Sequence, residues 1–174
     1  PQTVEPRNPG QALDLDWVMR AQANSSAIER RANTLPGRRS VKKQHRAAWL
    51  ARAISCIDLT TLTGDDTPGR VRRLCAKAMH PVRPDLLDAL DLPDLTVGAV
   101  CVYHDMIGPA VAALQGSGLP VAAVSTGFPA GLSPLHLRSA EIEESVKDGA
   151  AEIDIVISRR HVLTGNWQAL YDEM

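Results

Sequence analysis

Four short strand-like runs alternate with helical segments, and this alternation constrains the fold more than any other feature of the sequence. The runs span residues 56–59, 97–103, 121–126 and 152–157. Three of them are apolar almost throughout, as expected where helices cover a parallel sheet. Helix start and stop signals separate them, including Thr67-Pro68, Ser133-Pro134 and Gly149. The alternation therefore predicts an α/β domain with a parallel sheet.

The number of residues limits how large this sheet can be. The runs begin about 32 residues apart on average, and a closed eight-stranded barrel needs roughly 250 residues. Only 119 of the 174 residues follow position 55. We therefore expect about four βα units, which build either half of a (β/α)8 barrel or a small, open, doubly wound sheet. The pattern alone does not distinguish these two architectures.

Residues 1–55 precede the first strand and are interpreted as a polar tail followed by leader helices. A weak helical pattern in this segment is interrupted by Asn24-Ser25-Ser26. Ser40 is expected to cap a further helix that extends to about Ser55. The basic residues between Arg38 and Arg46 are expected to form a solvated face of that helix.

Composition excludes several classes of protein. The net charge is −1 and only six residues are aromatic, which argues against a nucleic-acid partner. The longest uncharged stretch, 106–137, is broken by glycine and proline, so we expect a buried helix and strand there and no membrane partner. Three cysteines are too few for a disulfide scaffold or a spaced zinc site and suit a reducing compartment. These features predict a cytoplasmic protein.

The last strand-like run places a carboxylate on the face away from the helices. Side chains alternate across a strand, so Glu152 and Asp154 share one face and Ile153, Ile155 and Ile157 share the other. The isoleucines are expected to contact the covering helices. Asp154 then points toward a barrel interior or the end of a sheet, where an unpaired carboxylate is costly. Two roles are open for it: a functional acid or a member of a structural ion pair.

The same alternation brings chemistry-bearing side chains of two earlier strands to the inward face. These side chains are Asp58, Thr60, Cys101 and Tyr103. Together with Asp154 they predict a lumen that contains two carboxylates, a thiol and a phenol. The alternatives are a turn-capping role for Asp58, a core role for Cys101 and a packing role for Tyr103.

Residues 127–131, Gly-Phe-Pro-Ala-Gly, follow the third strand at its carboxyl end. Ligands of α/β proteins bind at this edge, so a ligand-binding loop and a plain turn are both open. The loop lacks the glycine spacing of dinucleotide sites and P-loops, which argues against a nucleotide site. The five histidines share no metal-ligand spacing. We therefore expect no metal site.

Taken in order, the strand motifs resemble those of the deoxyribose-phosphate aldolase family. The motifs are Cys-Ile-Asp-Leu-Thr-Thr-Leu at 56–62, Ala-Val-Cys-Val-Tyr at 99–103, Gly-Phe-Pro-Ala-Gly at 127–131 and Gly-Ala-Ala-Glu-Ile-Asp-Ile-Val at 149–156. Segments 13–17 and 163–167 resemble the longer branch of the family that includes animal enzymes. The similarity covers about residues 13–174.

The resemblance implies a (β/α)8 barrel of which this chain is the amino-terminal half, with residues 1–55 as leader and 56–174 as the first half of the barrel. It implies an enzyme that cleaves the phosphorylated sugar 2-deoxyribose 5-phosphate to glyceraldehyde 3-phosphate and acetaldehyde, with no metal or organic cofactor. A lysine on the sixth strand would form a Schiff base with the substrate.

The resemblance also implies roles for four residues of the inward face. Asp154 would be the catalytic acid that takes part in proton transfer. Asp58, Thr60 and Cys101 would contact the substrate. One position departs from the family pattern, because His104 replaces the proline that is common after Tyr103.

The Schiff-base lysine has no counterpart among the four lysines Lys42, Lys43, Lys77 and Lys147, so we expect the 174 residues alone to be inactive. A half-barrel has two open sheet edges and is expected to form a homo-oligomer or to depend on a second half. Two other functions stay open. One is a noncatalytic half-barrel that dimerises or binds a small phosphorylated ligand, and the other is a small open α/β binding domain.

Overall fold

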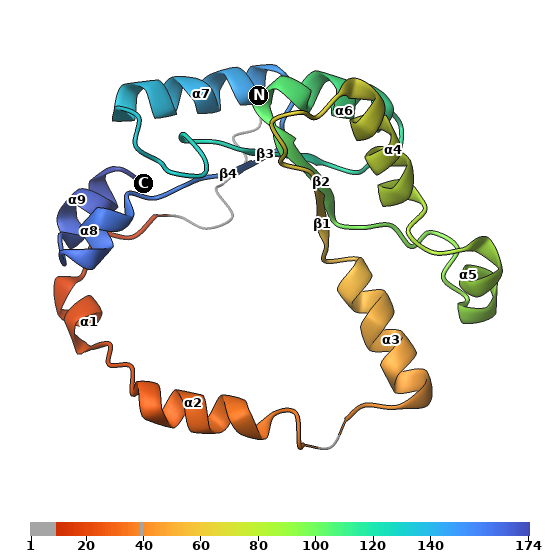
Figure 1. The fold of residues 1–174 in the computed structure, drawn as a ribbon, viewed down its shortest axis with the longest axis horizontal. Coiled ribbons are helices and arrows are strands. Elements are labelled where there is room, and N and C mark those ends of the chain that lie inside the picture. Colours follow the sequence, from red (N-terminus) through yellow and green to blue (C-terminus); the bar gives the residue numbers. More distant parts are fainter. Residues whose placement is uncertain (1–9, 39) are drawn as a thin grey trace. The chain divides into compact units, whose positions relative to one another are not determined.

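The computed structural model describes residues 10–38 and 40–174 (Figure 1). In chain order its elements are α1 (Leu15–Arg20), α2 (Ser25–Thr34), α3 (Lys43–Ile54), β1 (Asp58–Thr60), α4 (Pro68–Met79), α5 (Pro84–Leu90), β2 (Ala99–Tyr103), the 3-10 helix η1 (His104–Met106), α6 (Ile107–Ala113), β3 (Val121–Val124), α7 (Leu135–Lys147), β4 (Glu152–Asp154), α8 (Arg159–Leu163) and α9 (Trp167–Asp172).

The chain divides into two compact units. One contains the described residues of Pro1–Ser40 together with Arg159–Met174, and the other is Val41–Ser158. The boundary predicted between residues 55 and 56 follows the start of the βα repeat, whereas the division in the structure assigns α3 to the same unit as the sheet.

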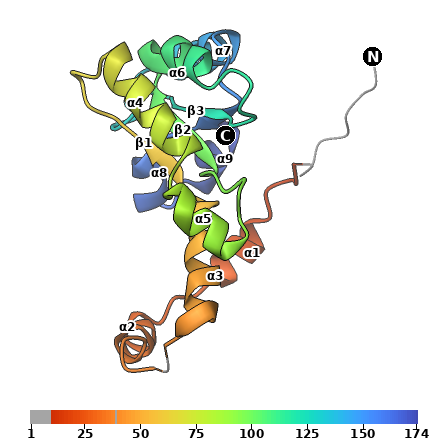
Figure 2. The ribbon, with the colours of Figure 1, turned by 90° about the vertical axis from the view of Figure 1, so that its right-hand side faces the viewer.

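The sheet settles which of the two predicted architectures the chain adopts. Its four strands are parallel and lie in the order β1-β2-β3-β4, with α4, α6 and α7 along one side of them (Figures 1 and 2). A doubly wound sheet reverses its strand order at a switch point, whereas a (β/α)8 barrel adds each strand beside the last. The structure therefore has the topology of a partial (β/α)8 barrel.

Local signals in the sequence explain where most helices of the second unit begin and end. The Thr67 hydroxyl group accepts a hydrogen bond from the N–H of Arg70 and caps α4, and Pro68 occupies the first turn. Helix α7 follows Pro134 and ends before Gly149, whose φ of +104° is readily adopted by glycine. These predicted boundaries are confirmed.

Two features of the helices differ from the sequence prediction. The predicted cap Ser40 does not cap α3, because Lys42 is extended (φ −131°, ψ 164°) and the helix starts only at Lys43. Helix α5 was missed. It begins at Pro84 and ends at Leu90, the following Asp91 adopts a left-handed conformation, and Leu87 is its one buried residue.

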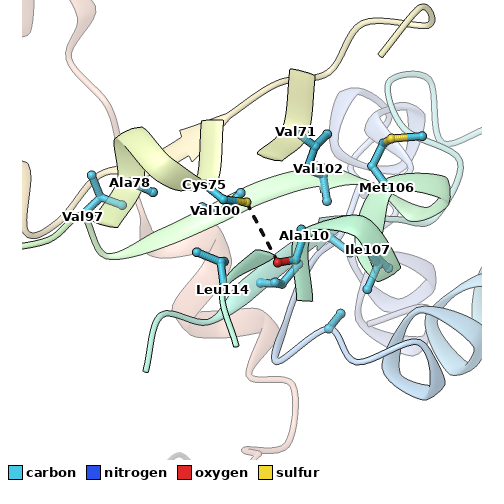
Figure 3. Close-up of a cluster of buried hydrophobic side chains, with 13 residues drawn as sticks. Val71, Cys75, Ala78, Val97, Val100, Val102, Met106, Ile107, Ala110 and Leu114 are labelled. Carbon is cyan, nitrogen blue, oxygen red and sulfur yellow. Dashed lines mark hydrogen bonds between the residues drawn. The ribbon is translucent and has the colours of Figure 1, made fainter. Parts of the chain in front are cut away.

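A core cluster between the sheet and its helices holds the second unit together, and we call it the helix-side core. Val100 and Val102 of β2 pack there with Val71 of α4 and Ile107 of α6 (Figure 3). All four side chains are fully buried. Burial of a side chain of this size stabilises a fold by about 1.5–3 kcal/mol. The predicted alternation along β2 is confirmed.

The last strand follows the predicted alternation over only part of its length. Ile153 packs against the helix-side core as expected. Strand β4 ends at Asp154, however, and Ile155 beyond it is 38% exposed and lies outside the core. The regular alternation of a strand therefore stops at Asp154, and the contact between Ile155 and the helices stays a prediction. Ile157 is half-buried.

The first unit consists of short, exposed helices with well-defined caps. Asp14 caps α1 through the N–H of Trp17, Asn24 caps α2 through that of Ala27, and Asn166 caps α9. The predicted interruption at Asn24 is thus the start of a second helix. The predicted polar tail lies largely outside the described residues. In the part of the chain that the structure describes, no helix combines the length and apolarity needed to cross a bilayer.

Candidate active site

The face of the sheet opposite the helix-side core, here called the inner face, is built from small apolar side chains. Ala99 and Cys101 of β2 and Ala122 and Val124 of β3 form a buried cluster on this face, and Leu62 and Tyr103 pack against it. All four residues of this cluster are at most 4% exposed. The inner face therefore differs from the helix-side core in the small size of its buried side chains.

The strand register arranges the polar residues of the inner face in levels. Thr60 pairs with Cys101, Cys101 with Ala122, and Ala122 with Glu152. One level nearer the carboxyl end of the strands, Tyr103, Val124 and Asp154 are aligned in the same way. Asp58 pairs with Ala99 one level nearer the amino end. Residues paired across parallel strands point to the same face, so all four strands contribute to one surface.

Asp154 presents its carboxylate to solvent on the inner face. Its neighbour Ile153 points to the helix-side core, so the two side chains lie on opposite faces of β4. The backbone carbonyl of Asp154 accepts a hydrogen bond of 2.9 Å from the N–H of Ser125. Among the described residues no ion pair to the Asp154 carboxylate is formed.

Cys101 lies at the centre of the inner face and is 4% exposed. Burial raises the pKa of its thiol, and the negative charges of Asp154 and Asp58 raise it further, while a hydrogen bond with Thr60 opposes them. The thiol therefore stays protonated at neutral pH and is a poor nucleophile. The strand register places Asp58, Thr60, Cys101 and Asp154 on the same face of the sheet, as the alternation predicts.

The loop after β3 is fixed at both ends by contacts with later segments. The N–H of Gly127 donates a hydrogen bond of 2.8 Å to the carboxylate of Glu141 in α7. Gly131 approaches Val156 so closely that an added Cβ would lie 2.8 Å from its Cγ1 atom, so only glycine fits. Between them Phe128 contacts the ring of Tyr103, with centroids 5.9 Å apart. The loop therefore forms part of the wall at the carboxyl edge of the inner face.

None of the four lysines lies on a strand or on the inner face. Lys42 and Lys43 are at the start of α3, Lys77 is in α4, and Lys147 ends α7. A hydrogen bond and the negative charge of Glu144 raise the pKa of Lys147. A lysine that forms an imine needs a lowered pKa. Among residues 10–38 and 40–174, no three histidine, cysteine or acidic side chains are grouped to hold a metal ion.

Two polar contacts near the site were missed by sequence reasoning. They are the Glu141 bond to Gly127 and the bond of 3.0 Å between His104 Nδ1 and the buried Ser145 hydroxyl group. Each joins residues whose sequence spacing carries no pattern. His104 Nε2 also lies 3.4 Å from Asp148.

Comparison with known proteins gives the chain a family. No family model matches it. It is 54% identical to the deoxyribose-phosphate aldolase of Mus musculus over 169 residues, which cover 95% of this chain and 53% of that protein. For the deoxyribose-phosphate aldolase of Homo sapiens the identity is 52% over 171 residues, 96% of this chain and 54% of that protein. The chain thus spans about half the length of the curated relatives that it matches.

Solved structures agree with this fold. The aldolase QR15 superposes with a TM-score of 0.55 at 22% identity over 69% of this chain and 47% of its own. The tetrameric deoxyribose phosphate aldolase of Aeropyrum pernix superposes with a TM-score of 0.53 at 22% identity over 71% of this chain and 44% of its own. At such identities the likeness shows the fold alone. With the animal relatives above, it shows that the chain belongs to the deoxyribose-phosphate aldolase family, of which it represents an amino-terminal half.

Proposed function

We propose that this chain supplies the first half of the active site of a deoxyribose-phosphate aldolase, a lyase that cleaves 2-deoxyribose 5-phosphate to glyceraldehyde 3-phosphate and acetaldehyde. The observation that carries the proposal is the inner face, where Asp58, Thr60, Cys101 and Asp154 converge from three parallel strands. Relatives at 52–54% identity bear the name of this enzyme. All three cysteines are free thiols, which supports a cytoplasmic location.

The proposed chemistry uses a lysine as a covalent catalyst. Its amine adds to the aldehyde carbon C1 of the open-chain sugar and water leaves, which gives a protonated imine. A base removes the proton of the C3 hydroxyl group, the C2–C3 bond breaks, and its electron pair moves toward the imine nitrogen. Glyceraldehyde 3-phosphate departs. The remaining enamine gains a proton at C2, and water then releases acetaldehyde and restores the amine.

In this scheme Asp154 moves protons through a bound water. Its carboxylate is exposed on the inner face, level with Tyr103, so it can accept a proton and return it. Asp58 and Thr60 hydrogen-bond the sugar from β1. Cys101 lines the space for the aldehyde, and its raised thiol pKa keeps it from competing with the lysine for the carbonyl carbon.

The imine-forming lysine and the phosphate-binding loops are proposed to lie in a second half-barrel outside this sequence. The positions of Lys42, Lys43, Lys77 and Lys147 support this, since all four are in or beside helices. The scheme uses no metal and no organic cofactor. The 174 residues alone are then expected to bind the sugar weakly and not to cleave it.

The unpaired edges of the sheet support association of this chain with another copy or with a second half-barrel. Among the described strands, β1 and β4 each have one neighbour, and unpaired parallel edges favour association. We expect the isolated chain to form a homo-oligomer or to assemble with the second half. Sedimentation velocity at micromolar concentration tests this, and a single monomeric species with cooperative unfolding would contradict it.

Borohydride trapping tests the catalytic proposal. The complete gene product that contains this chain and the 174 residues alone are each incubated with 2-deoxyribose 5-phosphate and borohydride, and adducts are located by peptide mass mapping. We expect one stoichiometric adduct on a lysine outside these residues, and turnover only in the complete gene product. An adduct on Lys42, Lys43, Lys77 or Lys147 with turnover, or no aldolase activity in either sample, would refute the proposal.

A further inference from the structure

The loop that joins β1 to α4 is organised by a buried carboxylate to which the scheme above gives no role. The side chain of Asp66 is 4% exposed, although the residue belongs to a surface loop. The loop leaves β1 at the carboxyl edge of the sheet, where the ligands of (β/α)8 barrels bind. A buried carboxylate persists only when hydrogen bonds compensate for the lost hydration.

Those hydrogen bonds come from the loop itself and from α4. The Thr61 hydroxyl group donates to both carboxylate oxygens of Asp66, at 2.9 and 3.0 Å, and the N–H of Thr63 donates at 3.1 Å. Arg70 Nη1 donates at 3.2 Å from the first turn of α4. Burial opposes ionisation of Asp66, but these bonds outweigh it and hold its pKa below the usual value.

Two of the three donors to Asp66, Thr61 and Thr63, flank a residue that packs on the inner face. Leu62 lies between Thr61 and Thr63, and it packs against the cluster around Cys101. The N–H of Thr61 also donates to the carbonyl of Cys101 at 3.1 Å. Asp66 therefore holds the side chain of Thr61 before Leu62 and the backbone of Thr63 after it.

We propose that Asp66 is a positioning residue that holds Leu62 and the end of β1 in place against the space where the substrate binds. The substrate part of this inference rests on the proposed aldolase function. Asp65 provides a matched comparison. Its carboxylate also binds Arg70, at 3.1 Å, but its side chain is 77% exposed and does not accept the bonds from the Thr61 hydroxyl group and the Thr63 N–H.

The kinetic test compares Asp66→Asn with Asp65→Asn in the complete gene product. An amide cannot accept all the bonds that the Asp66 carboxylate accepts, because one of its two ends is a donor. We expect Asp66→Asn to raise KM for 2-deoxyribose 5-phosphate about tenfold and to change kcat less than about threefold. Asp65→Asn should change either parameter less than about twofold.

A merely structural role would lower the melting temperature and leave KM unchanged, so that result would overturn the proposal. Thr61→Val supplies a second check. If the carboxylate acts through Thr61, the effects of Thr61→Val and Asp66→Asn on KM should not add in the double variant. Full additivity would also speak against the proposal.

An NMR measurement tests the positioning of Leu62 independently of the proposed aldolase activity. Methyl NMR on the same protein monitors contacts between Leu62 and the inner-face methyl groups of Ala99, Ala122 and Val124. We expect Asp66→Asn to weaken these contacts and Asp65→Asn to preserve them. If the unsubstituted protein lacks aldolase activity, the proposed function fails. The positioning of Leu62 is then tested by NMR alone, and it fails if the Leu62 contacts survive Asp66→Asn.

Discussion

The two faces of the sheet differ in the size and polarity of their side chains. On the helix side, Val100, Val102 and Ile107 are fully buried in a continuous apolar core. On the inner face the buried apolar residues are small, Leu62 and Tyr103 pack against them, and carboxylates such as Asp154 are exposed. The same strands supply both faces, since alternate residues point in opposite directions. If the inner face holds the proposed site, substitutions on the two faces should have separable effects on stability and on activity.

The largest separation is expected for Asp154→Asn in the complete gene product. The amide keeps the shape of the side chain but cannot exchange a proton, so kcat should fall about 100- to 10,000-fold, the usual contribution of general acid–base catalysis. The carboxylate is exposed and forms no ion pair among the described residues, so the free energy of unfolding should change by less than about 0.5 kcal/mol. Steady-state kinetics and urea unfolding measure the two quantities. Parallel losses of activity and stability would identify a structural residue.

The reverse pattern is expected on the helix side. Ile107→Ala removes a side chain with no exposed surface and should lower the free energy of unfolding by about 2–5 kcal/mol. Below the melting temperature, kcat should change little. Cys101→Ala on the inner face is the control, with an expected loss of about 1 kcal/mol. Equal losses for the two variants in urea unfolding would show that the helix-side core is not the main source of stability.

The comparison also explains which parts of the structure the sequence could predict. Alternation along β2 and the βα repeat placed Val100, Cys101 and the four strands correctly, because strand period and helix caps are local signals. The choice between half-barrel and doubly wound sheet depends on which strands are neighbours, and no local signal reports strand order. The last strand was predicted to extend to residue 157, whereas β4 ends at Asp154. Strand ends depend on pairing with β3, which is a tertiary property.

For the candidate site, the sequence could predict which side chains share a face but not the hydrogen bonds that hold them. The convergence of Asp58, Thr60, Cys101 and Asp154 follows from periodicity together with parallel strands. The Asp66 network does not, because its donors Thr61 and Thr63 become visible only when the loop is folded. A sequence can suggest which side chains face a lumen, whereas the contacts that hold them in place depend on backbone geometry.

The smallest expected effect is on the pH dependence of the melting temperature, and it compares the buried carboxylate of Asp66 with the exposed carboxylate of Asp65. The hydrogen bonds and charge of Arg70 hold the pKa of Asp65 below its usual value, and the bonds to Asp66 do the same for that residue despite its burial. A carboxylate whose pKa is lower in the folded state contributes stability above its unfolded pKa of about 3.9. That contribution is lost as the pH falls through the folded pKa.

The melting temperature should therefore decrease below about pH 4. Asp66→Asn should flatten this decrease more than Asp65→Asn, because the Asp66 carboxylate accepts hydrogen bonds from three residues whereas the exposed Asp65 carboxylate is screened by solvent. Thermal unfolding followed by circular dichroism between pH 2 and 6 measures the slope. Identical slopes in both variants and the unsubstituted protein would mean that other carboxylates dominate acid unfolding and that the β1–α4 loop opens independently of the sheet.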